Sequence, residues 1–328
     1  MIPLAAVIPY FQREAGILRR AVASALRQSG VDPFPIIVVD DSSPVPAADE
    51  LGELIRAHGD RIRIIRRENG GPAAARNAGL DAIEGAARYV AFLDSDDEWV
   101  EGHVANAVRV LERGADVYFT DFYHIDQDVS AFQRAARIDP ADHRQLFAAE
   151  PLYEYQGDMV VQILTGNVIG TSTLVYLFEK FADVRFREEF RYAGEDYLFW
   201  LDLAARDAKF AFSTVPECRC GRGVNVYSGS GWGTDRYAIR LHHEMKYRKT
   251  AARLFALSAE ARKSNARMIG RLRAAFVADL LHRARSREPI DLAVVLSQLR
   301  LDPLTVLGIL PVSYGLVKRA VVGPKGSC

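Results

Sequence analysis

Three carboxylates follow a short apolar stretch of the chain. Residues 89–93 are aromatic or aliphatic, and Asp94, Asp96 and Asp97 occupy three of the next four positions. Side chains two positions apart in an extended segment point to the same side, so we expect Asp94 and Asp96 to face one ligand and Asp97 to point elsewhere. A hard divalent ion that bridges carboxylate and diphosphate oxygens would offset the repulsion between the two carboxylates. The alternative is a strand end followed by the acidic start of a helix.

Four other short motifs accompany this acidic run. They are VIPYF at residues 7–11, VVDDSS at 38–43, GGPAAARNAG at 70–79 and GEDY at 194–197. The guanidinium of Arg76 can pair with a diphosphate or orient Asp94, and the alternative is a surface arginine on an alanine-rich helix. Glu195 and Asp196 stand at a helix start, where neighbours point about 100 degrees apart, so only one of them can aim fully at a site.

Strands and helices alternate through the first 120 residues. Short β-branched or aromatic stretches predict strands, and longer stretches with a polar face predict helices. This alternation indicates an α/β fold with a mostly parallel, Rossmann-like sheet and helices on both faces. Ligands bind such sheets beyond the carboxyl ends of the strands, where both acidic motifs fall. The predicted strands are 5–9, 35–40, 61–66, 89–94 and 116–120, and the predicted helices are 16–29, 47–58, 72–84 and 102–113.

The remainder of the chain gives a coarser prediction. We expect a loop-rich insertion with one or two short helices at 123–162, strands at 171–178 and 209–212, and a helix at 195–206. Residues 220–233 are rich in glycine and serine, which is typical of a loop. Basic helical patterns follow at 235–287 and 291–301, and an apolar stretch interrupted by glycine and proline covers 304–322.

In order and spacing, the five motifs resemble those of the family 2 glycosyltransferases of the GT-A fold, over residues 1 to about 215. The first strand and the Pro-Val-Pro at 44–46 are similar to bacterial exopolysaccharide glucosyltransferases of the succinoglycan type. The resemblance implies a UDP-sugar donor, with glucose as the sugar, and Mn²⁺ or Mg²⁺ as cofactor. It also implies a nucleotide-sugar half at 1–122, an acceptor half at 123–233 and a basic helical C-terminal region at 234–328.

The resemblance also assigns roles to the motif residues. Asp41 accepts from the imide N–H of uracil, with Asp40 as the weaker candidate, and the alternative is an Asx-turn before the next helix. Asp96 is the principal metal ligand. The other donor-binding residues are Pro9, Tyr10, Arg76, Asp94 and Ser95. Gln12 stands where the family more often has an asparagine, so we assign it no role.

The resemblance makes Asp196 the general base, which takes the proton of an acceptor hydroxyl. A single displacement inverts the configuration, so an α-linked donor yields a β-glycoside. The implied acceptor is a saccharide linked to a polyprenyl diphosphate. Glu195, Trp232, Tyr227 and Arg222 are candidates for acceptor contact or for a lid. The alternatives are a sugar nucleotidyltransferase of similar fold and a non-catalytic protein that binds nucleotide sugars or polysaccharides.

The net charge of zero hides an asymmetry. Residues 236–328 contain 18 Lys and Arg against 6 Asp and Glu, so residues 1–235 carry the balancing negative charge. A basic C-terminal region is typical of contact with an anionic lipid surface, and docking on the acidic body or a solvated helix face are the alternatives. We therefore expect a cytoplasmic protein, peripheral at the inner membrane face, with no nucleic-acid partner; a homodimer stays open.

Cysteine content and hydropathy indicate which kind of compartment the protein occupies. Three cysteines in 328 residues do not form a disulfide framework, which favours a reducing compartment. Cys218 and Cys220 form a Cys-x-Cys pair without evident partners, so we expect no zinc site there. We expect no secretory leader and no conventional membrane span, because no apolar run is long enough.

Overall fold

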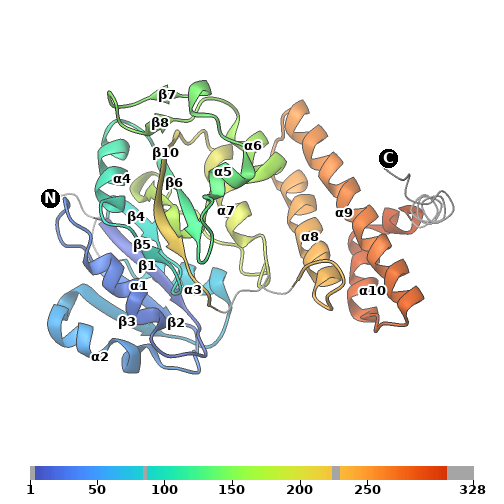
Figure 1. Cartoon of the computed structure of the whole chain (residues 1–328), viewed down its shortest axis with the longest axis horizontal. Helices are drawn as coiled ribbons and strands as arrows, with labels where there is room; N and C mark the ends of the chain where they lie inside the picture. Colours follow the sequence, from blue (N-terminus) through green and yellow to red (C-terminus); the bar gives the residue numbers. More distant parts are fainter. Residues whose placement is uncertain (1–3, 84–86, 224–229, 309–328) are drawn as a thin grey trace, which may run out of the picture. The chain divides into compact units, whose positions relative to one another are not determined.

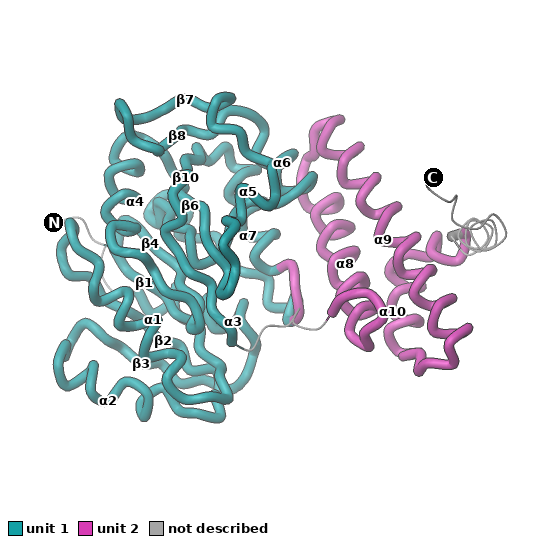
Figure 2. Tube along the Cα trace, viewed as in Figure 1, with its two compact units in different colours: residues 1–191, 195–225 teal, residues 192–194, 226–328 magenta. Residues whose placement is uncertain are grey.

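The computed structural model describes residues 4–83, 87–223 and 230–308. The chain divides into two compact units (Figure 2). The sheet unit comprises residues 1–191 and 195–225, and the helical unit comprises residues 192–194 and 226–328. All the described strands lie in the sheet unit, and the basic C-terminal region forms the helical unit.

The sheet unit is built on one ten-stranded sheet. Its first four strands are parallel in the order β3-β2-β1-β4, as the alternating pattern predicts. They are β3 (Ile62–Arg66), β2 (Ile36–Asp40), β1 (Leu4–Tyr10) and β4 (Tyr89–Phe92). The sheet continues as β9-β6-β10-β8-β7, in which only β6 and β10 run parallel to each other, so the sheet as a whole is mixed. These strands are β9 (Val175–Leu177), β6 (Val117–His124), β10 (Phe210–Cys220), β8 (Leu152–Glu154) and β7 (Arg144–Gln145), with β5 (Glu98–Trp99) beside β10.

Helices cover both faces of the sheet (Figure 1). Ala6 and Ile8 of β1 face the core formed with α1 (Ile17–Leu26), α2 (Ala47–His58) and α4 (His103–Glu112). Residues on the opposite face of the strands pack against α3 (Pro72–Asp81) and α7 (Glu195–Ala205). The approach of α3 is close, because a Cβ on Gly79 would lie 2.3 Å from Val7 Cγ1. The period-two alternation of the strands therefore fixes which helix meets which face.

The second half of the sheet unit departs from the predicted elements. Residues 171–178 contain a strand of three residues, β9, between two 3-10 turns, instead of one continuous strand. The predicted strand 209–212 is the beginning of the 11-residue β10, whose register shifts around Pro216 where it pairs with β6. The insertion holds the predicted short helices, α5 (Ala131–Ala135) and α6 (Met159–Gly166), and also the unpredicted β7–β8 hairpin.

The helical unit contains α8 (Tyr237–Leu254), α9 (Ala259–Ser286) and α10 (Leu292–Leu301), followed by the 3-10 turn η5 (Pro303–Gly308). Leu241, Met245, Leu272 and Phe276 form its core. Side chains of Ser258 and Asp291 cap α9 and α10 by accepting from backbone N–H groups of the first turn. Within the described part of the chain, no helix is long and apolar enough to cross a bilayer.

Candidate active site

The polar motifs meet where the parallel strands end. The segments that follow β1, β2 and β4 carry Gln12, Asp41 and Asp94, and the starts of α3 and α7 complete the site. Parallel strands deliver their carboxyl ends to one edge of a sheet, which is why motifs far apart in the sequence converge there.

The two acids at the end of β2 have different surroundings. The carboxylate of Asp40 accepts from the backbone N–H of Ser43 (2.7 Å) and of Ala47 (2.9 Å), so it caps the entry to α2. The carboxylate of Asp41 instead accepts from the N–H of Gly70 (2.9 Å) and of Gly71 (2.7 Å). Gly71 has a φ of 89°, in the left-handed region that favours glycine. Asp40 therefore takes the turn role, and Asp41 faces the glycine turn before α3.

Arg76 lies at the centre of the site. Its Nη2 donates to Asp94 Oδ1 (2.7 Å) and its Nη1 donates to Glu195 Oε1 (3.3 Å). The side chain is buried above the ring of Phe186, and its Nε has no hydrogen-bond partner among the residues that the structure describes. Burial alone would lower the pKa of Arg76, but the carboxylates of Asp94 and Glu195 outweigh it and raise the pKa. The guanidinium thus joins the acidic run after β4 to the acidic start of α7.

Asp96 sits in a cradle of glycines. A Cβ on Gly223 would lie 2.6 Å from Asp96 Oδ2, and one on Gly221 would lie 1.8 Å from the backbone oxygen of Asp96. Burial, with the negative charge of Asp94 added, raises the pKa of Asp96 to about 6. Asp96 and Asp94, two residues before it, are both half-buried and offer carboxylate oxygens, the hard donors that Mn²⁺ and Mg²⁺ prefer.

Asp97 holds three segments together. It accepts from Ser172 Oγ and from the backbone N–H of Gly221 (2.9 Å). The same Ser172 Oγ accepts from the N–H of Asp94 (2.9 Å), and the Ser172 carbonyl accepts from Trp99 Nε1 (2.6 Å). Asp97 is therefore a buried structural carboxylate that fixes the loop carrying Asp94 and Asp96.

The two acids that begin α7 both lie near the positive charge of Arg76, and Glu195 accepts a hydrogen bond from it. Burial raises the pKa of Glu195, and Arg76 opposes the shift. Burial and the charge of Glu195 raise the pKa of Asp196 to about 7, again against the charge of Arg76. Asp196 is thus a half-buried carboxylate that gains and loses a proton near neutral pH.

Residues 5–181 match the family model described as Glycosyl transferase family 2. The chain belongs to this family. The family 2 transferase described here is also 35% identical over 233 residues to the "Succinoglycan biosynthesis protein ExoW" of Rhizobium meliloti (strain 1021), which covers 69% of this chain and 71% of that protein. It is accordingly a glycosyltransferase. The comparisons do not support the two alternative interpretations, a sugar nucleotidyltransferase and a non-catalytic binding protein.

Two solved structures share the fold of this transferase. TarS 1–349 of S. aureus, in complex with UDP-GlcNAc, has a TM-score of 0.57 at 18% identity over 94% of this chain and 81% of the other. The mannosyltransferase PcManGT from Pyrobaculum calidifontis, in complex with GDP-Man and Mn²⁺, has a TM-score of 0.58 at 17% identity over 97% and 86%. At these identities the likeness shows the fold alone, and it confirms the predicted GT-A fold.

Not every predicted site residue of the transferase is open to a ligand. Pro9, Tyr10, Asp41 and Ser95 are all buried, and the Tyr10 hydroxyl donates to the carbonyl of Val45 (2.7 Å). The predicted wall beside the base is therefore not an exposed surface in this structure. Trp232 is exposed in the helical unit, where its ring lies 5.6 Å from that of Tyr237. Tyr227 lies outside the described residues.

Three features of the transferase site escaped the sequence prediction. Gln12, to which we assign no role from the sequence, donates from Nε2 to Ser95 Oγ (3.1 Å) and so ties the β1 loop to the acidic run. Ser172 gives no local signal, since its partners lie more than 70 positions away in the chain. Gly221 and Gly223 are visible in the sequence as part of a glycine-rich segment, but their contact with Asp96 is not.

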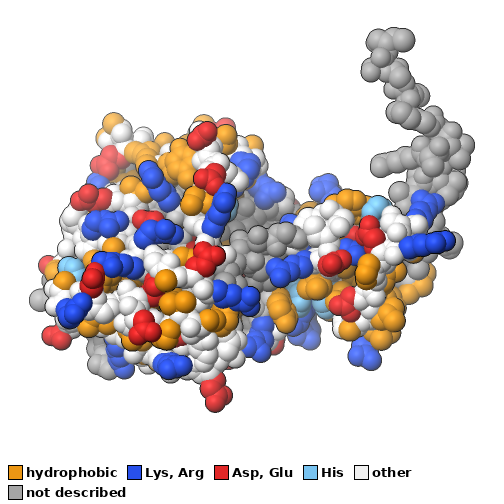
Figure 3. Space-filling view, turned by 60° about the horizontal axis from the view of Figure 1, so that its bottom comes forward, with side chains coloured by type: hydrophobic (Ala, Val, Ile, Leu, Met, Phe, Trp, Pro, Cys, Tyr) orange, Lys and Arg blue, Asp and Glu red, His pale blue; other side chains and the backbone are white. Residues whose placement is uncertain are grey.

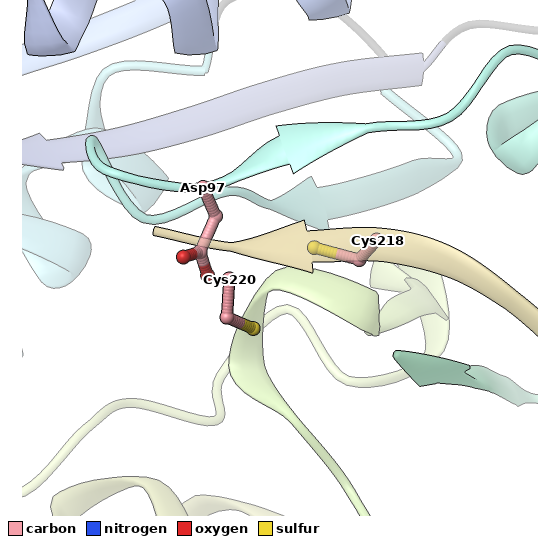
Figure 4. Close-up of side chains that lie close together, drawn as sticks. All are labelled: Asp97, Cys218 and Cys220. Carbon is pink, nitrogen blue, oxygen red and sulfur yellow. The ribbon is translucent and has the colours of Figure 1, made fainter. Parts of the chain in front are cut away.

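The Cys-x-Cys pair has an unforeseen neighbour. The carboxylate of Asp97 and the thiols of Cys218 and Cys220 lie within 4.8 Å of one another at the end of β10 (Figure 4). The hydrogen bond to Cys220, together with burial, raises the pKa of Cys218 well above its ordinary value. The expectation of a pair without partners is therefore corrected. The described residues bring three ligand groups together there, one fewer than a structural zinc site uses, and Asp97 already accepts two hydrogen bonds.

Proposed function

We propose that this enzyme transfers glucose from UDP-glucose to a saccharide acceptor, with inversion, during exopolysaccharide biosynthesis. The pathway and the sugar rest on the similarity to the succinoglycan biosynthesis protein and on the residue motifs. The observation that carries the mechanism is the hydrogen-bonded network Asp94–Arg76–Glu195, which ties the donor-side acids to the start of the helix bearing Asp196.

In this proposal each residue has one task. Asp41 accepts from the uracil imide N–H, and Ser95 and Asp94 contact the ribose or the donor sugar. Asp196 takes the proton of the acceptor hydroxyl while its oxygen bonds to the anomeric carbon from the side opposite UDP. The bond from that carbon to the diphosphate breaks, and UDP leaves. A divalent cation bound at Asp96, when present, neutralises the charge that develops on the departing diphosphate.

The acceptor in this proposal is a saccharide linked to a polyprenyl diphosphate at the inner membrane face. Glu195 and Trp232 are the candidate acceptor contacts. The similarity to a succinoglycan biosynthesis protein and the basic helical unit support this acceptor and location.

A donor panel tests the proposal. Hydrolysis of UDP-glucose, UDP-galactose, UDP-GlcNAc and GDP-mannose is measured with Mn²⁺, with Mg²⁺ and with EDTA. We expect turnover that needs the metal and prefers UDP-glucose. Turnover that persists in EDTA contradicts the metal site, and a preference for GDP-mannose contradicts the uracil contact of Asp41.

A further inference from the structure

The helical unit exposes a cluster of large apolar side chains at α10 and η5. Twelve large apolar side chains are exposed among the described residues, and five of them lie between 292 and 307. These five, which we call the α10 face, are 50–69% exposed: Leu292, Leu296, Leu304, Val306 and Leu307. Hydrophobic side chains are also prominent on the helical unit in Figure 3. Exposed large apolar side chains concentrated in one short stretch of the chain are typical of a binding face.

Buried polar residues hold the α10 face outward. Gln298, on the opposite side of α10, is fully buried and its Nε2 donates to Thr305 Oγ1 (3.1 Å). Asp302 is 1% exposed and accepts from Lys249 Nζ (2.9 Å) and from Arg273 Nε (2.7 Å). α10 thus carries apolar side chains on both sides, because Val294, Val295 and Leu301 pack against the core of the helical unit while Leu292 and Leu296 face outward. The orientation is fixed by hydrogen bonds, so the exposure is a property of the fold.

The net charge of the helical unit selects the partner. Among residues 230–308, ten Lys and Arg are exposed against three Asp and Glu. Leu292, Leu296 and Arg300 follow at intervals of four, so they lie along one row of α10. The sequence continues at 309–328 with many aliphatic residues, three basic residues and no acid. A second copy that met this face with its own α10 face would bring an equally basic helical unit, whereas an anionic bilayer complements both the charge and the apolar side chains.

We propose that the α10 face inserts into the surface of a bilayer that contains anionic phospholipid and so anchors the enzyme there. This proposal rests on the proposed function, because an enzyme anchored at a membrane would meet an acceptor that is linked to a membrane lipid. The leucines enter the boundary between headgroups and acyl chains, and the exposed basic side chains meet the lipid phosphates.

Flotation of the full chain with vesicles tests the α10 face directly. Vesicles of phosphatidylcholine alone and of phosphatidylcholine with phosphatidylglycerol are compared for wild type, the double variant L292D/L296D and L254D. Leu254 is an exposed leucine of the same unit that ends α8, outside the face, and serves as the matched control. We expect L292D/L296D to bind the anionic vesicles at least ~10-fold more weakly than wild type, because carboxylates replace the two leucine side chains that would enter the bilayer. Wild type and L254D should bind alike, and both should bind pure phosphatidylcholine more weakly.

Several outcomes would overturn the proposal. The first is that L292D/L296D binds the anionic vesicles as strongly as wild type does. The second is that L254D loses as much vesicle binding as L292D/L296D. The third is that wild type binds the two vesicle types equally at low salt. A wild-type dimer that L292D/L296D converts to monomer, without any change in vesicle binding, would assign the face to self-association instead. Circular dichroism and UDP-sugar hydrolysis of the double variant show that it is folded. Vesicle binding needs no donor, so an inactive but membrane-bound enzyme would contradict the proposed function and leave this anchor standing.

Discussion

The acids Glu195 and Asp196 are neighbours in sequence but differ in their contacts. Glu195 accepts from Arg76, while the hydrogen bond found for Asp196 is from the backbone N–H of Tyr197 (2.8 Å). Burial and the nearby charge of Glu195 raise the pKa of Asp196 to about 7. A carboxylate with this pKa is a stronger base than an ordinary aspartate and is still largely ionised just above neutral pH.

The pH dependence of transfer should report this pKa. Asp196 must be ionised to accept a proton, so we expect kcat/KM to rise with pH through about 7. In E195Q a negative neighbour is lost and the pKa of Asp196 falls, so the rise should move to lower pH. The exposed Glu53 provides the control E53Q, which should leave the profile in place. A midpoint that does not move in E195Q would contradict the coupling of the two acids.

Replacing the proposed base, Asp196, gives a sharper test. The D196N side chain keeps its size but cannot take a proton, so we expect transfer to fall by at least ~10²-fold. Calorimetric titration should show that UDP affinity is unchanged, because Asp196 contacts the acceptor in the proposed mechanism. Transfer at the wild-type rate would remove Asp196 as the base.

Among the elements, α3 connects the two halves of the site through Arg76. Its guanidinium reaches Asp94, 18 positions away, and Glu195, 119 positions away. The loop after β4 and the start of α7 are therefore held by one buried cation. The predicted contact between Arg76 and Asp94 is therefore present. Arg76 also has a second partner, Glu195, that the sequence did not indicate.

Removing that cation should destabilise the sheet unit. In R76M a buried Glu195 and a half-buried Asp94 lose their partner, and we expect a loss of about 3 kcal/mol in the free energy of unfolding. Arg185 pairs with Asp81 at the surface, so R185M should cost less than about 1 kcal/mol. Urea unfolding measures both. Equal losses in the two variants would mean that the Arg76 network contributes no more than a surface pair.

The segment after β10 positions Asp96 by its lack of side chains. A Cβ at Gly223 would lie 2.6 Å from both Asp96 Oδ2 and Gln12 Nε2. We therefore expect G223A to weaken Mn²⁺ binding by roughly 10-fold or more, as displaced neighbours of a metal ligand do. Gly231 has open space around its Cβ position, and G231A is the matched control. Mn²⁺ titration followed by electron paramagnetic resonance would distinguish them, and equal affinities would refute the glycine cradle.

For the whole molecule, the division into two units predicts a selective response to ligand. In the proposed function UDP with Mn²⁺ binds the folded sheet unit. The free energy of unfolding of that unit should then rise by about 2.7 kcal/mol at a hundredfold excess of ligand over Kd, and its thermal transition should move to a higher temperature. The transition of the helical unit should not move, since none of the proposed donor or metal ligands lies in it. Differential scanning calorimetry with and without EDTA measures this. A shift that EDTA leaves intact would contradict metal-assisted UDP binding.

The sequence by itself determined the parallel half of the sheet, the helices around it and the family. Strand and helix periods are local, and parallel strands must end at one edge, so the pattern alone places Asp41, Asp94 and Asp96 at that edge. The sequence also shows that the C-terminal region is basic, because its charged residues can be counted directly.

Only the tertiary structure decided the partners of those residues. It separated Asp40 from Asp41, gave Arg76 its second carboxylate and placed Ser172 beneath the acidic run. It also extended β10 and turned the leucines of α10 outward. These outcomes depend on strand pairings and hydrogen bonds between segments far apart in the chain. Such contacts form only when the chain closes on itself, so no local pattern of residues records them.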